Sequence, residues 1–524
     1  MYDRPHSSRF AAPSAGGRSV PRRWTRESFI PFRLEVLTPV FIGTGSDFSP
    51  LEYVIRAENG GHALHMVDTE SWLLAAQDRE DTHAALDRGD TLGLRRLMNE
   101  QLDTALYSQA HVPVPSAKLA KDLLENIKNP NSLSKAEIQP FVRNPVTKTA
   151  LVPGSSLKGA LSTPLIDSLD HGALLRAVQQ GDKRAYTREM EHLLGNIKEH
   201  SMQALKVSDV PVPPEGTRIV AAVEVRREGG KPGTPKTPCE ALAPTGFGGL
   251  PLYGRLLMDI VSGVPRITLP KDRPVSLTEL ARLCNAFYGK RFRDEMDKFY
   301  RLPHLTAVGE RLQPVLRRIE GLNPERELLL RVGHYSHVEC VTVSNNKPQA
   351  RKGFGKTRTL ADRELPFGWV VLSFCPEAEY EQGLARVEAA IATAVQERQA
   401  KRSARNKGLC RLLDAQRKLA EAAEQARAKA EEEQQRKERA AAERAKMLAA
   451  LSPDERSIAE VAESDATEKQ SMDLYGRLSS LDGDVQTRAA SALRDCWQRL
   501  GKWEGKLSKK QTEKVAAVKR ILEG

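Results

Sequence analysis

The feature that most constrains the fold of this chain is a long run without helix breakers. Neither glycine nor proline occurs between Gly408 and Pro453, and 381–450 consists mainly of Ala, Glu, Gln, Lys and Arg. These residues have high helix propensity, and opposite charges recur four positions apart, so the sequence predicts one long charged helix over 381–450. Alanine occupies most positions of a would-be coiled-coil seam, which favours a solvated helix over a coiled coil.

A smaller helical region is predicted after this helix. In 452-SPDE-455, Ser452 is the expected N-cap, Pro453 the first helical residue and Glu455 the capping-box partner. Large apolar residues then recur at helical spacing, so 452–524 is predicted to form a small helical bundle. These residues are Leu474, Leu478, Leu481, Leu493, Trp497, Leu500, Trp503, Val515, Val518 and Ile521.

Before the long helix, the sequence predicts strands separated by helices. Near the start, Phe32, Leu34 and Val36 alternate with Arg33 and Glu35, which is typical of a half-buried strand. Further strands are predicted at 63–67, 218–225, 255–261, 327–332 and 369–374, and a long helix at 276–300, opened by Ser276 and Glu279 as a capping box.

Strands and long helices recur in both parts of the chain up to about residue 376. This pattern predicts an α+β fold with two domains of related size, at 28–215 and 216–376. Residues 1–27 mix Arg, Pro, Ser and Gly without a periodic apolar face, so we expect a disordered basic arm there.

The charge balance favours a polyanionic partner. Lys and Arg number 80 and Asp and Glu 68, a formal net charge of +12 with a pI near 9.3. The six cysteines are scattered and never occur as C-x-x-C, so neither a disulfide framework nor a zinc site is predicted. Without a leader-like or membrane-spanning apolar run, we expect a soluble, cytoplasmic protein with no membrane partner.

The stretch 151-LVPGSSLKGALS-162 contains the residue types of a phosphate-binding loop. Lys158 precedes Gly159, however, whereas a mononucleotide P-loop needs its lysine after the last glycine. The sequence instead predicts a Pro-Gly turn, an N-cap at Ser155 or Ser156, and Lys158 one turn into a short helix. Such a helix start could attract a phosphate of a nucleic-acid backbone, and a capped helix between two core elements is an equally good interpretation.

A later loop, 350-ARKGFGKT-357, satisfies a relaxed P-loop pattern with Ala350 in place of the first glycine. The buried strand before it and the helix after it are not predicted, so an ATP site is not expected. Its basic side chains are predicted instead to contact phosphates, because glycines let the backbone follow an irregular polyanion. They are Arg351, Lys352, Lys356 and Arg358.

Two histidines, His334 and His337, are the strongest candidates for metal or acid/base chemistry. At the end of a strand their side chains would point to opposite faces and could not share an ion, so hydrogen-bonding loop histidines are predicted. A role in RNA cleavage stays open as an alternative, because imidazoles titrate near neutrality. No nucleophile or two-metal motif is recognisable, so no catalytic residue, metal or cofactor is predicted.

Five segments, taken in this order, resemble one known family. They are 38-TPVFIGTGSDFSPLEYVI-55, 151-LVPGSSLKGAL-161, 206-KVSD-209, 239-CEALAP-244 and 356-KTRTLADRELPFGWVVL-372. Over about residues 29–376 the chain is similar to the RAMP proteins that form the fifth subunit of type III-A CRISPR Csm complexes. The resemblance implies two ferredoxin-like (RRM-like) units, followed here by an α-helical C-terminal extension longer than the family's usual length.

The resemblance also implies a function. Such proteins are non-catalytic subunits that bind the 3′ portion of the guide RNA (crRNA), cap one end of the complex and support guide maturation and antiviral defence. The implied partners are the guide RNA, the adjacent backbone RAMP subunit, the small helical subunit of the Csm complex, and cellular nucleases that trim the 3′ end. The alternative is a RAMP-type endoribonuclease that processes precursor guide RNA, with His334 as acid/base.

Several residues on glycine turns match positions that the resemblance places near RNA. They are Gly43, Gly45, Gly154, Ser155, Ser156, Lys158 and Gly159, with Lys356 and Arg358 in the late loop. The chain departs from the family at Ser162 and Thr163, where many relatives carry arginine and threonine. Pro164 follows and is predicted to kink or end the helix. After Gly333 the family's aromatic-glycine pair is missing.

Overall fold

The computed structural model describes residues 28–58, 60–77, 79–129, 135–179, 183–229, 233–246, 249–261, 264–344 and 355–524. The chain divides into two compact units within one long helix, the first ending at Cys410 and the second beginning at Arg411. The arm predicted over 1–27 lies outside the described residues.

A five-stranded antiparallel sheet lies at the centre of the first unit. Its strands, in spatial order, are β16 (Glu327–Arg331), β19 (Trp369–Phe374), β1 (Phe29–Val36), β12 (Leu252–Met258) and β6 (Leu205–Val207). Phe32, Leu34 and Val36 of β1 are buried on one face, and Arg33 and Glu35 lie on the other, which confirms the predicted alternation.

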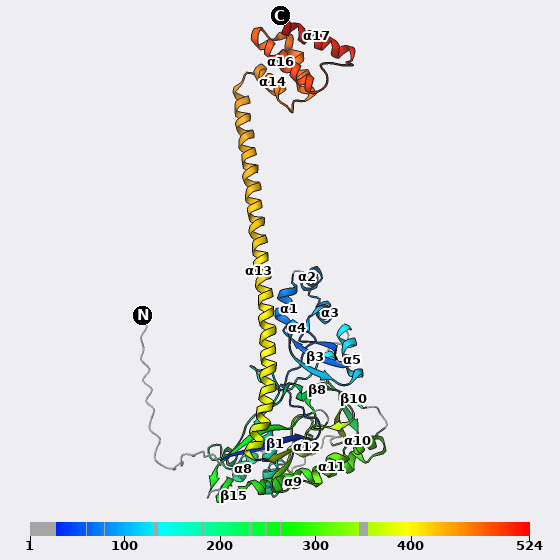
Figure 1. Cartoon of the computed structure of the whole chain (residues 1–524), viewed down its shortest axis with the longest axis vertical. Coiled ribbons are helices and arrows are strands. Elements are labelled where there is room, and N and C mark those ends of the chain that lie inside the picture. Colours follow the sequence, from blue (N-terminus) through cyan, green and yellow to red (C-terminus); the bar gives the residue numbers. More distant parts are fainter. Residues whose placement is uncertain are drawn as a thin grey trace, which may run out of the picture. The chain divides into compact units, whose positions relative to one another are not determined.

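Two long helices cover the buried face of this sheet. They are α6 (Gly154–Leu169) and α9 (Leu277–Glu295), which contact each other; α9 is labelled beneath the sheet in Figure 1. Ser276 caps α9 as predicted, since its Oγ accepts the N–H of Glu279 at 3.1 Å. The helix then widens into a π turn over Met296–Tyr300.

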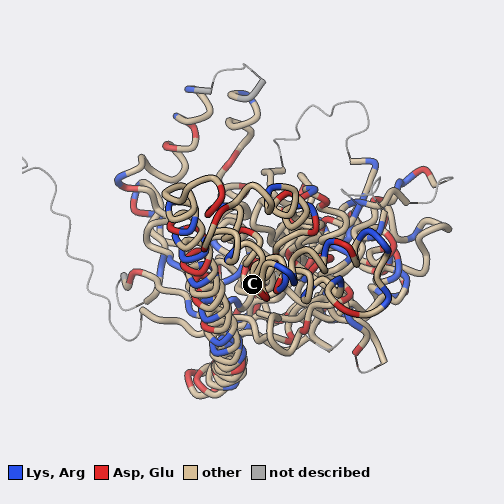
Figure 2. The backbone as a smooth tube through the Cα atoms, turned by 90° about the horizontal axis from the view of Figure 1, so that it is seen from above, with Lys and Arg blue, Asp and Glu red and all other residues tan. Residues whose placement is uncertain are grey.

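The opposite face of the sheet receives the first turns of α13 (Glu377–Ala450). Arg255 of β12 forms an ion pair with Glu377, and its guanidinium lies 4.4 Å from the centre of the Tyr380 ring. Lys and Arg are interleaved with Asp and Glu along the rest of α13 (Figure 2). None of the described helices combines the length and the apolar composition needed to cross a membrane.

One predicted strand is interrupted in the structure. The stretch 218–225 breaks at Ala221 into β8 (Thr217–Val220) and β9 (Ala222–Arg226). Ala221 leaves the strand ladder because its N–H donates to the Asp362 carboxylate at 2.9 Å and its carbonyl accepts the N–H of Asp362 at 2.8 Å. The two halves therefore join different sheets.

The remaining strands of the first unit form small sheets. β9 pairs with β10 (Thr234–Pro235) and with β17 (Thr357–Ala361), and β17 also pairs with β18 (Leu365–Pro366). β8 pairs with β11 (Cys239–Leu242), and β5 (Leu151–Val152) pairs with β7 (Val210–Pro211). In a further sheet, β14 (Val264–Leu269) lies between β13 (Ile260–Val261) and β15 (Arg273–Ser276). The other helices are α7 (Ala173–Gln179), α8 (Lys183–Leu194), α10 (Thr306–Arg311), α11 (Gln313–Glu320) and α12 (Val338–Val341).

A lobe built from the residues after β1 has a sheet of its own, coloured blue to cyan in Figure 1. Its strands are β2 (Tyr53–Glu58), β3 (Gly61–Val67) and β4 (Ser108–Val114), and its helices are α1 (Thr69–Ala76), α2 (Glu80–Asp87), α3 (Thr91–Gln101), α4 (Thr104–Tyr107) and α5 (Ala117–Lys128). Tyr53, Leu64, Val112 and Leu123 are central to its core.

The strand pairing of the main sheet does not follow the predicted domain boundary between 215 and 216. β1 pairs with β12 and β19, both from the second predicted domain, and β6 from the first joins the same sheet. Two ferredoxin-like units are therefore not confirmed. The first unit is a mixed α/β fold with one principal sheet.

The second unit contains the rest of α13 and four further α-helices, α14 (Pro453–Ala462), α15 (Glu468–Arg477), α16 (Gly483–Arg499) and α17 (Lys509–Glu523). The predicted capping box of Ser452 and Glu455 opens α14. Trp497 is buried in the core and donates its indole N–H to Ser471 Oγ at 3.0 Å. Of the predicted apolar residues, Leu500 is 38% exposed, because it follows the last helical residue of α16.

Candidate nucleic-acid interface

Helix α6 begins within the stretch 151–162. The N–H of Gly154 donates to Asp209 Oδ1 at 2.8 Å, and neither Ser155 nor Ser156 caps the helix, so the predicted N-cap is wrong. The carboxylate stabilises the positive end of the helix and occupies the place predicted for a phosphate. Gly154 is needed here because a Cβ would lie 2.1 Å from the carbonyl oxygen of Val207.

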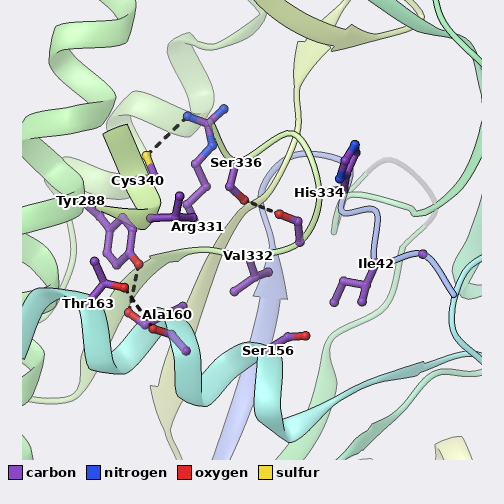
Figure 3. Close-up of a pocket in the computed structure, with 14 residues that line it drawn as sticks. Ile42, Ser156, Ala160, Thr163, Tyr288, Arg331, Val332, His334, Ser336 and Cys340 are labelled. Carbon is purple, nitrogen blue, oxygen red and sulfur yellow. Dashed lines mark hydrogen bonds between the residues drawn. The ribbon is translucent and has the colours of Figure 1, made fainter. Parts of the chain in front are cut away.

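The helix also continues past Pro164 to Leu169, although a kink or an end was predicted there. Proline has no N–H to bond the carbonyl of Ala160. The hydroxyl of Tyr288 donates to that carbonyl at 2.9 Å instead, as the dashed line in Figure 3 shows. Tyr288 thus replaces the missing helical bond and joins α9 to α6.

Lys158 lies one turn into α6, half-buried and beside Lys206 of β6. Burial lowers the pKa of Lys158, and the positive charge of Lys206 lowers it further. The pKa of His200 is likewise lowered, first by burial and then by the charge of Lys158. None of the ion pairs among the described residues includes Lys158. The charge of Lys206 disfavours the protonated form of Lys158, and an anion beside Lys158 would offset this effect.

A cavity of about 520 Å³ lies along α6, and Lys158 is not among the residues that line it. Ser156, Ala160 and Thr163 line it from the helix (Figure 3), and Gly159 and Gly43 are also among its lining residues. A Cβ at Gly159 would meet nothing within 4 Å, so the glycine leaves this wall open. The structure therefore brings three of the predicted positions, Gly43, Ser156 and Gly159, to one hollow.

The loop after β16 lines the cavity and has a strained backbone. Gly333, Tyr335 and His337 have φ angles of 84°, 64° and 58°, a region that side chains other than glycine rarely adopt. A Cβ at Gly333 would lie 2.3 Å from the carbonyl oxygen of Phe41, and the N–H of His334 donates to that same oxygen at 2.7 Å. This close approach fixes the loop against the glycine turn.

The two histidines of this loop both have lowered pKa values. Burial, together with the charges of Arg331 and Arg358, lowers the pKa of His337 to about 3, so its ring is neutral near pH 7. The pKa of His334 is also lowered, by burial and then by Lys236. Within the described ranges, no three His, Cys, Asp or Glu side chains gather as metal ligands.

Arg358 is not available to a phosphate, contrary to the prediction from sequence. It is 4% exposed, with Nε 3.2 Å from Glu295 Oε1 and Nη2 3.1 Å from Glu339 Oε1. Arg331, which lines the cavity, also pairs with Glu295. The pKa of this carboxyl falls to about 2, because the two guanidinium groups outweigh the effect of its burial. Arg358 is therefore part of the support beneath the strained loop.

The other predicted basic residues differ in position. Lys356 is exposed and pairs with exposed Glu228 at 3.0 Å, a surface pair that a phosphate could replace at little cost. Arg351 and Lys352 lie outside the described residues. Gly45 has a φ of 87° and supplies the turn next to Gly43.

Sequence reasoning did not identify the roles of Lys206, Asp209 or Tyr288. Lys206 and Asp209 belong to the noted 206-KVSD-209 segment, which by itself gave no indication that Asp209 would bond the start of α6 or that the charge of Lys206 would act on Lys158. Tyr288 could have been suspected only from the need to satisfy the carbonyl opposite Pro164.

Fold and site together define a mixed α/β protein with a long C-terminal helical region and a basic helix start beside an open cavity. The chain belongs to the RAMP superfamily, whose family model matches residues 33–302.

The chain is similar to several solved structures, two of which are described here. One is a chain of the cryo-EM structure of a Csm–crRNA–target RNA ternary complex of a type III-A CRISPR–Cas system, with 20% identity and a TM-score of 0.48, covering 66% of this chain and 100% of that one. The other is the crystal structure of T. onnurineus Csm5, with 20% identity and a TM-score of 0.36, covering 65% and 99%. No curated protein matches the sequence.

Proposed function

We propose that this protein is a non-catalytic, crRNA-binding subunit of a type III-A CRISPR–Cas (Csm) complex that caps the 3′ end of the guide RNA. The observation that carries the proposal is the half-buried Lys158 one turn into α6, which pairs with no carboxylate among the described residues and whose pKa is lowered by burial and by the charge of Lys206. Membership of the RAMP superfamily and the five ordered segments that resemble the fifth Csm subunit support the same role.

The chemistry of this interface suits a guide of variable sequence. Ammonium groups contact phosphates without preference for a base, whereas base recognition needs side chains that reach base edges. Gly43, Ser156 and Gly159 line the adjoining hollow with main chain and small side chains, which gives a strand room to pass close to the backbone. The adjacent backbone RAMP subunit, the small helical subunit and trimming nucleases are the partners that this role implies.

The test uses residues 1–410, the first compact unit, with labelled single-stranded RNAs of two unrelated sequences. Lys158→Ala should weaken binding of both RNAs about tenfold, as expected for one charged contact of roughly 1.4 kcal/mol. The slope of log K against log salt should fall by about 0.7. Lys158→Arg keeps the charge and should bind nearly as the natural chain does. If Lys158→Ala left both the affinity and the salt slope unchanged, Lys158 would not contact the RNA and the proposed interface would be rejected.

A further inference from the structure

A further cavity, of about 680 Å³, lies in the first unit between the lobe and α13. Its walls come from α1 and α4 of the lobe, which Figure 1 shows beside α13, from the loop over 145–148, and from residues 395–406 of α13. Among the described residues, none lines both this cavity and the one along α6. The lobe, the loop and the helix are distant in the sequence, so the tertiary fold creates this cavity.

Two arginines of α13 attach the helix to the walls of this cavity. Arg398 donates to the carbonyls of Val146 and Thr147, at 2.9 and 2.5 Å. Arg405 pairs with Asp68 at 2.8 Å and is 9% exposed, and its buried Nε has no hydrogen-bond partner. These contacts fix the orientation of the helix along the cavity.

Three more cations line the same cavity. Lys401 and Arg402 lie between the two attached arginines on α13, and Lys148 lies on the loop. In the part of the chain that the structure describes, none of these three side chains forms an ion pair or a hydrogen bond. At 3.6 residues per turn, positions 398, 401, 402 and 405 fall within about 100° of the helix circumference, so the four cations of α13 share one face. Positive charges from two separate elements therefore converge on one cavity.

The carboxylates of this cavity do not balance its positive charge. They are Asp68, which is already paired, and the exposed Glu70, whereas five Lys or Arg side chains line the cavity. A smaller hollow of about 330 Å³ adjoins it through shared lining residues and adds Glu215 and Glu397. The excess of positive charge therefore belongs to the larger cavity, where a group with more than one negative charge would offset it.

The other lining groups indicate what this anion carries. Val146 and Leu74 line the cavity and are 78% and 49% exposed. A cavity of about 300–1,000 Å³ with apolar walls and a few charged groups is typical of a site for a small ligand. Arginine and lysine bind phosphates through charge-assisted hydrogen bonds, and an apolar wall can pack against a base. A nucleoside phosphate has both of the parts that this cavity would contact.

We propose that the cavity binds a nucleoside phosphate, with its phosphate on the three unpaired cations and its base against Val146 and Leu74. The ligand is either a free nucleotide or one nucleotide of an RNA strand, because both present the same chemistry to the cavity. The α6 interface contributes no residue to this site, so the proposal goes beyond the proposed function and does not depend on it.

The test uses the full chain carrying Lys158→Ala, which removes the main charge of the α6 interface from every comparison. Isothermal titration calorimetry measures the binding of AMP and of a short single-stranded RNA. Adding Lys148→Gln with Arg402→Gln should weaken binding of the ligand that occupies the cavity about tenfold or more, because two charge-assisted contacts are lost. Both side chains are exposed, so thermal melting by circular dichroism should not change. The matched control, Lys290→Gln with Arg317→Gln, removes two exposed cations outside the cavity and should stay within about twofold.

The two sources of the ligand give different results. If the cavity holds a nucleotide of a strand, the cavity variant weakens RNA binding; if it holds a free nucleotide, AMP binding falls and RNA binding does not change. Equal losses in the two double variants, or no loss of either ligand in the cavity variant, would overturn the proposal. Binding of hexaglutamate in place of both ligands would also reject it and would indicate an acidic peptide. Because Lys158 is replaced in every chain compared, this site and the α6 interface can fail separately.

Discussion

Replacing Glu295 by glutamine tests whether the buried ion pairs of Glu295 with Arg331 and Arg358 stabilise the loop after β16, which lines the cavity. Arg331 and Arg358 are 2% and 4% exposed, and both lie against this carboxylate. Tyr300 also donates its hydroxyl to Glu295 Oε1 at 2.8 Å. Glu295→Gln keeps the shape of the side chain but removes the negative charge that both buried guanidinium groups contact.

The pKa of Glu295 gives the size of the effect. Burial alone would raise the pKa, but the charges of Arg331 and Arg358 lower it from 4.5 to about 2. At about 1.4 kcal/mol per unit of pKa, the lowered pKa of Glu295 contributes roughly 3 kcal/mol to the free energy of unfolding at neutral pH. Removal of one partner from a buried ion pair costs about 3–5 kcal/mol, in the same range.

The sign of the pH dependence follows from the lowered pKa. The stabilisation is fully present above pH 4.5, the unfolded value, and is lost as the pH falls toward 2 and the carboxylate takes up a proton in the folded chain. The difference in stability between the natural chain and Glu295→Gln should therefore be largest near pH 7 and shrink below pH 4.5.

Urea unfolding of residues 1–410, followed by tryptophan fluorescence, measures this difference. Trp369 is a suitable reporter, because the guanidinium of Arg331 lies 4.7 Å from its ring centre. The control is Glu339→Gln, which also removes a partner of Arg358 but at a side chain that is 41% exposed; its cost should stay below about 1 kcal/mol. Equal losses in the two variants, or a pH-independent difference, would refute the reasoning.

Three further predictions concern α6 and the cavity. Gly154→Ala should lower the free energy of unfolding by about 1–3 kcal/mol or more, because its Cβ meets a backbone carbonyl. Gly159→Ala should be neutral or stabilising by up to ~1 kcal/mol, because its Cβ meets nothing. The midpoints of urea unfolding compare the two variants. Tyr288→Phe should cost about 1–3 kcal/mol in the same titration, because it leaves the buried carbonyl of Ala160 unpaired; a cost near zero would show that this bond is dispensable. Labelled precursor RNA should remain uncleaved by the natural chain and by His334→Ala, with or without divalent cation, and a specific product lost only in the variant would support the endoribonuclease alternative.

Local patterns predicted the local elements well. The alternation around Leu34 identified β1 and its buried face, and the caps at Ser276 and Ser452 marked the starts of α9 and α14. The long helix begins at Glu377, four residues before its predicted start at 381. In each case the signal and the structure that it specifies lie within a few residues of each other.

The predictions that failed depend on partners that are distant in the sequence. The cap of Gly154 comes from Asp209, and Arg358 is neutralised by Glu295, residues that no local pattern associates with either position. An arginine in a glycine-bearing basic loop has the same sequence signature whether it faces solvent or a buried carboxylate. The predicted positions Gly43, Ser156 and Gly159 do line one cavity, but their contact with RNA stays a prediction.

The position of β1 in the main sheet has a consequence for synthesis on the ribosome. This strand emerges first, and its neighbours β12 and β19 end at Met258 and Phe374. At about 5–20 residues per second, the roughly 340 residues that separate β1 from the end of β19 take about 20 to 70 s to translate. Throughout that interval at least one edge of β1 lacks the strand that pairs with it in the folded protein. An unpaired apolar strand can associate with other chains, so a chaperone would be needed most during this time.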